Sequence, residues 1–338
     1  MTKKRMQVGI FADGSATLGA GHQVRTRALA EALLAAGHQV QLRCRDLPGS
    51  PHGWAWQGLP QVVLSAELSP QVALAQCPGD LLVVDQYEIT GEDLPLDRLV
   101  LVIDDVPGRA LHQADIVLNQ NLGVASTAYG DRGRVGPTFA LLRPPFARHH
   151  FAPHHFAHYH RRVSESAPVL VMLGGTDHRH LAMTIVAHLS AAGLPVLAIS
   201  REVVPGPGIE VREVMTAEEL ALALATCRAA VFGAGSAVWE ALCVGAPLVA
   251  VHTAANQDGI VTGLREQNLA VILQPSSVSQ VAAAVLQTLR PAAWDGLFRS
   301  VGLSPPGILS GDNLQKLGRV LGAADERDLY RRFTTFGD

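Results

Sequence analysis

The amino-acid sequence predicts an α/β protein made of two Rossmann-like domains, each with a parallel sheet. Apolar runs of strand length alternate with helical patterns along the whole chain, which is typical of parallel sheets covered on both faces by helices. The order of strand, glycine-containing loop and helix occurs twice, in residues 8–22 and again in residues 169–180. A length of 338 residues also exceeds the usual size of one domain.

In the first half of the chain, five short apolar runs predict strands over residues 7–11, 39–44, 81–84, 99–103 and 116–118. A helix is expected from about His22 to Ala36. It ends at Gly37, because glycine is favoured immediately after a helix C-terminus.

In the second half, apolar runs predict strands over residues 169–173, 196–199, 229–232 and 248–251, and a helix over residues 181–192. Thr216 and Glu219 have the spacing of a capping box and predict the start of another helix. Ser277 or Ser279 is expected to cap a helix over residues 281–289.

The predicted domains are an N-terminal Rossmann-like domain (residues 1–145), a linker (146–166), a C-terminal Rossmann-like domain (167–311) and a helical tail (312–338) that can dock on the N-terminal domain. Prolines interrupt the helical pattern in the linker. The linker also contains six histidines, His149, His150, His154, His155, His158 and His160. Adjacent histidines in a connector do not converge by spacing alone, so we expect no metal there, a metal site being the alternative.

Composition and charge exclude several classes of protein. Hydrophobic residues make up 48% of the chain and charged residues 17%, which is a globular balance. We expect no membrane span, which would need roughly 20 consecutive, predominantly apolar residues. The formal net charge is -3, so the chain offers no overall positive charge to attract a polyanion, and we expect no nucleic-acid partner. The N-terminal apolar run is too short for a signal peptide, so we expect a cytoplasmic protein.

The cysteines predict neither a disulfide framework nor a zinc site, because they are far apart and form no CxxC pair. They are Cys44, Cys77, Cys227 and Cys243. We expect buried structural thiols.

The most informative segment, residues 13–27, follows the first predicted strand. Loops at this end of a strand line the crevice in which α/β proteins bind ligands. Gly19 and Gly21 allow a substrate to approach the backbone closely. His22 stands at a helix N-terminus, where the positive end of the helix dipole disfavours the imidazolium and keeps the ring available as a base. We expect His22 to be catalytic; a capping or packing histidine is the alternative.

Carboxylates end the next predicted strands. Asp85 and Tyr87 follow one strand, and Asp104 and Asp105 follow the next. These carboxylates either orient His22, bind sugar hydroxyls or cap the helices that follow. The Tyr87 phenol suits a substrate hydrogen bond, the alternative being a half-buried aromatic at the sheet edge.

A glycine turn follows the first strand of the second domain and contains Gly174, Gly175 and Thr176. Its backbone N–H groups suit a diphosphate. No lysine follows, so this is not a P-loop, and magnesium-dependent nucleotide hydrolysis is not indicated.

A second turn contains Gly233, Gly235 and Ser236 and precedes a helix whose N-terminus can take phosphate. Glu240 on that helix can bind a ribose diol. A dinucleotide fingerprint would need glycine at Val238, which argues against NAD. Together the two turns predict a nucleotide-diphosphate pocket.

Polar residues also follow a later strand, where Asn256 and Gln257 suit sugar hydroxyls. Arg143 is expected to pair with an anionic sugar or a phosphate.

In this order the segments resemble the GT-B nucleotide-sugar enzymes, most closely the family of the UDP-sugar hydrolase of pseudaminic acid biosynthesis and the spore-coat polysaccharide proteins. The resemblance covers nearly the full chain. It rests on residues 13–22, Asp85-Gln86-Tyr87, Ile103-Asp104-Asp105, Asn119-Gln120-Asn121, residues 136–144, Gly174-Gly175-Thr176-Asp177, residues 233–240 and Asn256-Gln257. The chain is more distantly similar to the N-acetylglucosaminyltransferase that completes lipid II.

The resemblance implies that the C-terminal domain binds the UDP-sugar, that Glu240 takes the ribose, and that His22 acts as base across the cleft from the N-terminal acceptor and catalytic domain. We expect His22, Tyr87 and Asp105 to be catalytic. The acceptor or sugar site is expected to comprise Asp13, Arg25, Asp85 and Arg143. The implied donor-binding residues are Gly21, Gly174, Gly175, Thr176, Gly235, Ser236, Glu240, Asn256 and Gln257. It also implies that neither a metal nor another cofactor is needed, because helix dipoles and backbone N–H groups stabilise the departing UDP. UDP is displaced from the anomeric carbon with inversion.

The chain departs from the family at cleft positions. It has Gln86 where the hydrolases usually have the histidine of Asp-His-Tyr, Phe11 where they have arginine, and Ser236-Ala237-Val238 where they have a Ser/Thr-rich turn. The residues expected to bind the donor are kept, while positions that line the cleft have changed. Low lysine with abundant alanine and arginine is typical of high-GC sources, where relatives include cytosylglucuronic acid synthases.

We therefore expect an inverting, metal-independent glycosyltransferase that moves the sugar of a UDP-sugar to a small soluble acceptor, for example from UDP-glucuronate to a nucleobase. One alternative is a UDP-sugar hydrolase, in which water attacks the anomeric carbon and UDP and free sugar are released. Another is a non-catalytic nucleotide-sugar sensor.

Overall fold

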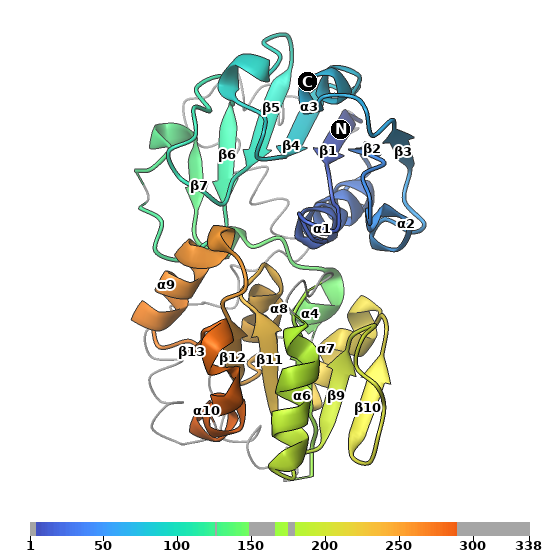
Figure 1. Cartoon of the computed structure of the whole chain (residues 1–338). Helices are drawn as coiled ribbons and strands as arrows, with labels where there is room; N and C mark the ends of the chain where they lie inside the picture. Colours follow the sequence, from blue (N-terminus) through green and yellow to red (C-terminus); the bar gives the residue numbers. More distant parts are fainter. Residues whose placement is uncertain (1–4, 126, 149–165, 175–179, 289–338) are drawn as a thin grey trace. The chain divides into compact units, whose positions relative to one another are not determined.

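The computed structural model describes residues 5–125, 127–148, 166–174 and 180–288 (Figure 1). The chain divides into two compact units. Among the described residues, the first unit ends at Leu142 and the second begins at Arg143. Each unit contains one parallel sheet.

The first unit has a seven-stranded sheet in the order β3-β2-β1-β4-β5-β6-β7. Its strands are β1 (Gln7–Ala12), β2 (Gln39–Arg45), β3 (Gln61–Leu64), β4 (Leu81–Asp85), β5 (Leu99–Ile103), β6 (Ile116–Asn119) and β7 (Gly133–Val135). Its described helices are α1 (Gly21–Ala35), α2 (His52–Ala55) and α3 (Pro70–Ala75), with 3-10 turns η1 (Gly91–Asp93), η2 (Gly130–Arg132) and η3 (Pro137–Phe139). After α1 the chain turns at Gly37, whose φ of 92° lies in the left-handed region that glycine tolerates.

Apolar side chains cover both faces of this sheet. Along β4, Leu81 and Val83 pack in the same cluster as Leu29 of α1, whereas Leu82 and Val84 join the cluster on the other face. Successive strand residues point to opposite faces, so this division is what a strand buried on both sides requires.

The second unit has a six-stranded sheet in the order β10-β9-β8-β11-β12-β13. Its strands are β8 (Val169–Met172), β9 (Val196–Ile199), β10 (Ile209–Arg212), β11 (Ala229–Gly233), β12 (Leu248–Val251) and β13 (Val271–Leu273). Its described helices are α4 (Pro144–Arg148), α6 (Leu181–Ala191), α7 (Ala217–Thr226), α8 (Ala237–Val244), α9 (Asp258–Glu266) and α10 (Val281–Thr288), with 3-10 turns η5 (Ala255–Gln257) and η6 (Pro275–Gln280).

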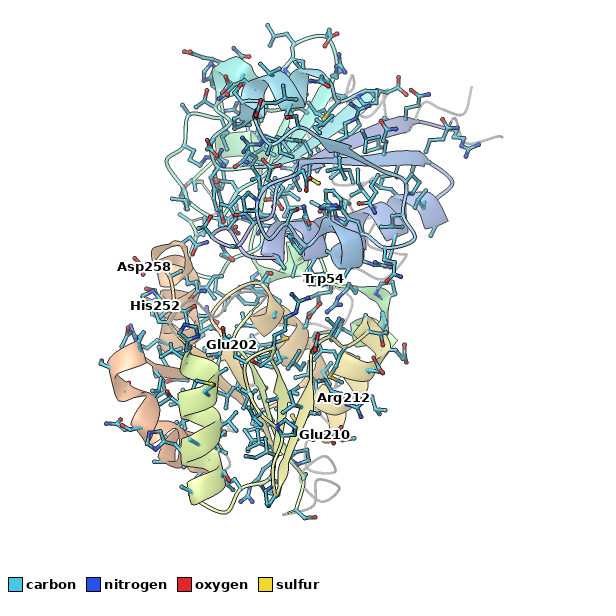
Figure 2. All side chains as sticks on the ribbon, turned by 45° about the vertical axis from the view of Figure 1, so that its right-hand side comes forward. Trp54, Glu202, Glu210, Arg212, His252 and Asp258 are labelled. Carbon is cyan, nitrogen blue, oxygen red and sulfur yellow. The ribbon has the colours of Figure 1, made fainter. Side chains whose placement is uncertain are left out.

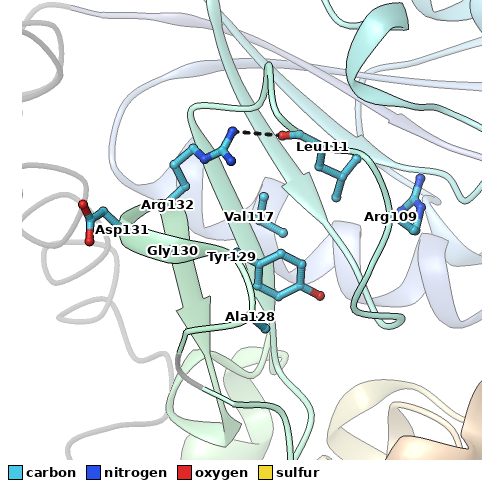
Figure 3. Close-up of a pocket in the computed structure, with 8 residues that line it drawn as sticks. All are labelled: Arg109, Leu111, Val117, Ala128, Tyr129, Gly130, Asp131 and Arg132. Carbon is cyan, nitrogen blue, oxygen red and sulfur yellow. Dashed lines mark hydrogen bonds between the residues drawn. The ribbon is translucent and has the colours of Figure 1, made fainter.

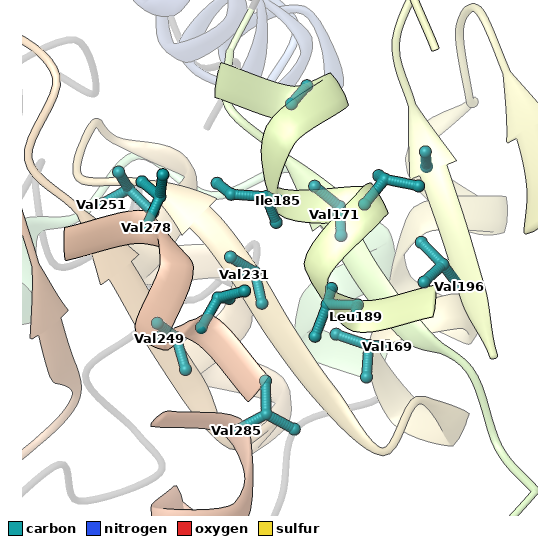
Figure 4. Close-up of a cluster of buried hydrophobic side chains, with 14 of the residues drawn as sticks. Val169, Val171, Ile185, Leu189, Val196, Val231, Val249, Val251, Val278 and Val285 are labelled. Atoms are coloured by element: carbon teal, nitrogen blue, oxygen red, sulfur yellow. The ribbon is translucent and has the colours of Figure 1, made fainter. Parts of the chain in front are cut away.

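The core of the second unit lies between the central strands and two helices. Val171, Val231 and Val249 of the strands belong to one buried cluster with Ile185 of α6 and Val285 of α10 (Figure 4). Each such side chain contributes roughly 1.5–3 kcal/mol when removed from water, so this cluster holds the central strands and the two helices together.

The α/β class with parallel sheets is confirmed, and the predicted strands and helices occur within one or two residues of their expected bounds. The capping box is confirmed as well, since Thr216 accepts from the Glu219 amide and Glu219 from the Thr216 amide. One cap is corrected: Ser277 hydrogen-bonds Gln274 at the start of η6, and both Ser277 and Ser279 lie within η6 instead of at the residue before α10. The strands β3, β7, β10 and β13 were not predicted.

The prediction of buried thiols is confirmed. All four cysteines are free and buried. Burial raises the pKa of each to about 12.

The predicted domain limits remain a prediction, because most of the linker and the whole tail, residues 312–338, lie outside the described residues. The described start of the linker falls in α4, where Phe146 is fully buried. This helix packs against α7 and α8 of the second unit.

Candidate active site and nucleotide site

In the first sheet the order of the strands reverses between the neighbouring strands β1 and β4. β1 leads to β2 and β3 on one side, and β4 leads to β5, β6 and β7 on the other. Such a switch point leaves a crevice at the carboxyl ends of the two neighbouring strands. The loop after β1 leads to His22, the second residue of α1, and β4 ends at Asp85.

His22 and Asp85 form a buried hydrogen-bonded pair at this point. Nδ1 of His22 lies 2.6 Å from Oδ1 of Asp85, and the two residues are 6% and 1% exposed. An ionised carboxylate only accepts, so Nδ1 carries the hydrogen, and in the neutral ring Nε2 keeps its lone pair. The Tyr87 ring packs edge-on against the imidazole with ring centres 4.7 Å apart. A histidine fixed in this way suits a general base.

Arg25 binds the same carboxylate through two further hydrogen bonds. Its Nε donates to Oδ2 of Asp85 and its Nη2 to Oδ1, both at 2.6 Å. Burial alone would raise the pKa of Asp85, but Arg25 and His22 hold that pKa well below its usual range. Burial would likewise lower the pKa of Arg25, yet the carboxylates of Asp105 and Asp85 raise it above its usual value. Asp85 is therefore ionised at neutral pH.

Asp105, just after β5, joins Tyr87 and Arg25. Nη1 of Arg25 donates to Oδ1 of Asp105 at 2.8 Å, and Oη of Tyr87 donates to Oδ2 at 2.6 Å. Burial and the charge of Asp105 raise the pKa of Tyr87, so the phenol stays protonated. We call His22, Arg25, Asp85, Tyr87 and Asp105 the His22 cluster.

Asp13 is bound into the protein next to this cluster. Its Oδ1 accepts from the backbone N–H of Arg45 at 2.7 Å, and its Oδ2 accepts from Nε of Arg45 at 2.8 Å and Nε2 of Gln86 at 2.7 Å. Asp13 is 1% exposed. It thus ties the end of β1 to β2 and to the residue after β4, and Gln86, a departure from the family pattern, supplies one of these bonds.

Asp104 belongs to a neighbouring network. It accepts from Oη of Tyr129 at 2.7 Å and from Nη1 of Arg109 at 2.9 Å. Arg109 and Tyr129 line a cavity of about 490 Å³ (Figure 3). Arg132 also lines it and donates to the carbonyl of Leu111 at 3.2 Å. The guanidinium groups of Arg109 and Arg132 both donate to oxygens of the protein itself. Cζ of Arg109 lies 5.8 Å from the centre of the Tyr87 ring, so this network also supports Tyr87.

The second sheet has its own switch point, between β8 and β11. A Cβ on Gly233, the last residue of β11, would lie 2.6 Å from the Leu173 carbonyl oxygen, so the close approach of the two strand ends requires glycine there. Gly174 has a φ of 110°, in the region that favours glycine. Apart from Gly235 and its two chain neighbours, no described residue has an atom within 4 Å of a Cβ built on Gly235, so its backbone can be approached closely.

Helix α8 follows this turn and carries Glu240 in its first turn, after Ser236 at the N-cap. Glu240 forms a two-bond ion pair with Arg143: Nε to Oε1 at 2.8 Å and Nη2 to Oε2 at 2.9 Å. The structure therefore brings together two residues that the sequence assigned to different tasks. The adjacent Trp239 is buried, and its indole N–H has no hydrogen-bond partner among the described residues.

The residues after β12 mostly bond among themselves. Oε1 of Gln257 accepts from the Thr253 N–H at 2.8 Å. His252 lies against Asp258, with Nε2 2.8 Å from Oδ1 (Figure 2). Asn256 is exposed. Gln257 thus shapes this loop, and the sugar contacts expected of Asn256 and Gln257 stay predictions.

Several expected features cannot be placed. Gly175, Thr176 and the segment from His149 to His160 lie outside the described residues. Within the part that the structure describes, no three His, Cys, Asp or Glu side chains gather into a metal-binding group. No helix in that part is long and apolar enough to span a membrane.

Sequence reasoning did not predict the hydrogen bonds of Arg45 to Asp13 and of Asn121 to Asp105. Nδ2 of Asn121 donates to Oδ1 of Asp105 at 3.1 Å, while its Oδ1 is buried without a partner in the described residues. Asn121 follows β6, so the rule that polar residues at strand ends line the crevice was a usable signal. Arg45 is the last residue of β2, in which polar and apolar residues alternate, so the same rule applied to it.

The two parallel sheets give the chain the fold of the GT-B glycosyltransferases. It matches CalG4, the calicheamicin glycosyltransferase, with a TM-score of 0.61 and 16% identity over 95% of this chain and 100% of that one. It matches the glycosyltransferase VinC, solved in complex with dTDP, with a TM-score of 0.60 and 14% identity over 93% of this chain and 99% of that one.

Among curated proteins, the chain is similar to the spore coat polysaccharide biosynthesis protein SpsG of Bacillus subtilis (strain 168). The two are 24% identical over 296 residues, which cover 79% of this chain and 84% of SpsG. No protein-family model matches the chain.

Proposed function

We propose that the chain is an inverting, metal-independent glycosyltransferase that moves the sugar of a UDP-sugar to a small soluble acceptor in the cytoplasm. The observation that carries the proposal is the buried His22–Asp85 pair at the switch point of the first sheet, with a carboxylate held ionised by Arg25. The similarity to SpsG and the GT-B fold support nucleotide-sugar chemistry. The dTDP complex of VinC supports a pyrimidine diphosphate donor.

In this proposal, Nε2 of His22 takes the proton of the attacking acceptor group, a hydroxyl or a nucleobase N–H, as its oxygen or nitrogen bonds to the anomeric carbon. The bond from that carbon to the diphosphate oxygen breaks, UDP leaves with the electron pair, and the configuration inverts. Asp85 stabilises the imidazolium that forms, while Tyr87 and Asp105 shape the acceptor or sugar site.

The second unit supplies the donor site in this proposal. The backbone at Gly174 and Gly235 binds the diphosphate with the N-terminus of α8, and Glu240 binds the ribose. Oriented N–H groups then stabilise the charge that develops on UDP, so no metal is required.

The experiment is UDP and dTDP release from a panel of sugar nucleotides that includes UDP-glucuronate, with and without a pool of small acceptors that includes nucleobases. Mass spectrometry identifies the sugar product. Release that requires an acceptor and yields a conjugate is the expected result. Equal release with free sugar would make the chain a hydrolase of the same donor, and binding without release would make it a sensor.

A further inference from the structure

The ion pair between Arg143, just before α4, and Glu240 of α8 is held by two hydrogen bonds and is largely buried. Both bonds are shorter than 3 Å, at 2.8 and 2.9 Å, and the two side chains are 12% and 6% exposed. Cζ of Arg143 also lies 5.0 Å from the centre of the Phe146 ring, and Phe146 is fully buried in α4. The guanidinium is therefore fixed from both sides, and it fixes both oxygens of the carboxylate.

The place of this pair matters because Glu240 lies in the first turn of α8, directly after the glycine turn at the β8/β11 switch point. A carboxylate at that place carries the same sign of charge as a diphosphate and would repel it. Arg143 is the cation that cancels this charge.

The pair also leaves the carboxylate able to bind a ligand. Each carboxylate oxygen has two lone pairs, and the ion pair uses one on each oxygen. The remaining lone pairs belong to two oxygens held in one plane at a fixed spacing. Two such acceptors suit two neighbouring hydroxyls, which is the arrangement of the 2′ and 3′ hydroxyls of a ribose.

We propose that Arg143 is a positioning residue for the donor nucleotide: it orients both oxygens of Glu240 toward the ribose diol and neutralises Glu240 beside the diphosphate. This inference rests on the proposed function. It makes Arg143 part of ribose selection, which differs from direct pairing of Arg143 with a phosphate or an anionic sugar.

The test measures the affinity of the full chain for UDP and for 2′-deoxy-UDP by calorimetry. Hydrogen bonds to a charged group are worth enough to predict roughly 10- to 100-fold tighter binding of UDP than of 2′-deoxy-UDP by the wild type. Arg143→Met is expected to weaken UDP binding by about tenfold or more and to bring the ratio of the two affinities close to one. Arg143→Lys keeps the positive charge but cannot make both parallel hydrogen bonds to Glu240. UDP should therefore bind more tightly than to Arg143→Met, while the ratio of the UDP and 2′-deoxy-UDP affinities stays below that of the wild type.

Arg212→Met is the matched control, because it removes an arginine from an exposed ion pair with Glu210 in the same unit. It should change neither affinity nor ratio. If Arg143→Met folds poorly, as shown by thermal unfolding, the double variant with Glu240→Gln removes the unpaired charge, and its ratio should also be close to one.

Equal weakening of UDP and 2′-deoxy-UDP in Arg143→Met would overturn the inference and favour a phosphate contact of Arg143. An unchanged ratio with unchanged affinity would overturn it as well. A wild-type chain that binds neither nucleotide would instead contradict the proposed function.

Discussion

Replacing Asp85 by asparagine tests how the His22 cluster is held together. The Asp85 carboxylate accepts three hydrogen bonds of 2.6 Å, one from His22 and two from Arg25. Removing one partner of a buried ion pair costs about 3–5 kcal/mol. Arg25 keeps its bond to Asp105, so we expect a loss near 3 kcal/mol, or roughly 6–12 °C in melting temperature.

The loss depends on pH. The pKa of Asp85 in the folded chain lies below that of an ordinary aspartate, about 3.9 in an unfolded chain. The stability it contributes is therefore complete above about pH 5 and is lost as the pH falls below about 4 toward the folded pKa. Urea unfolding between pH 7 and pH 3 should show the wild type and Asp85→Asn converging at acid pH.

Activity separates the role of Asp85 from a general loss of stability. Asp85→Asn should lower kcat by two or more orders of magnitude, because a neutral amide stabilises the imidazolium poorly; related histidine–carboxylate pairs lose about 10⁴-fold. Asp104→Asn is the control, since Asp104 is also buried and bonded to an arginine, but leaves His22 and Asp85 in contact. Its stability should fall comparably with a far smaller loss of kcat. A fully stable Asp85→Asn at pH 7, or equal activity losses in both variants, would refute this reasoning.

Tyr87, Gly233 and the buried thiols give three simpler tests. Tyr87→Phe removes the hydrogen bond to Asp105, so kcat/KM should fall about tenfold while calorimetry shows unchanged UDP affinity; weakened UDP binding would contradict this. Gly233→Ala forces a Cβ to within 2.6 Å of the Leu173 carbonyl oxygen and should destabilise the chain by about 1–3 kcal/mol in urea unfolding, whereas Gly235→Ala, with open space, should not. The four cysteines, with pKa values raised to about 12 by burial, should react with a thiol reagent only on unfolding, and fast labelling of the native chain would show otherwise.

The fold was predictable where strands are buried on both faces. β5 and the first four residues of β4 are continuous apolar runs, and every residue of both strands is buried, so the sequence marks them clearly. β10, at the edge of its sheet, has the residues Ile-Glu-Val-Arg with no fully buried position, and β7 contains only three residues. Pairing with a neighbouring strand defines such edge strands, and local sequence carries little of that information.

The His22 cluster was predictable in part for a similar reason. His22, Asp85, Tyr87 and Asp105 each follow a strand, and parallel strands bring their carboxyl ends to one edge. The partners Arg143 and Glu240 are 97 residues apart, and neither spacing nor local pattern connects them. Asp13 was expected near the substrate. The structure shows that it accepts hydrogen bonds from Arg45 and Gln86. The sequence does not reveal such partners, because they depend on how the strands pack.

The most direct test of the proposed function is sugar-nucleotide turnover by His22→Gln, measured with UDP affinity on the same preparation. Glutamine keeps a polar side chain at the start of α1 but cannot take the proton. We predict that turnover falls at least 100-fold while UDP affinity and melting temperature stay close to those of the wild type. Turnover within a few fold of the wild type would show that His22 is not the base and would contradict the account.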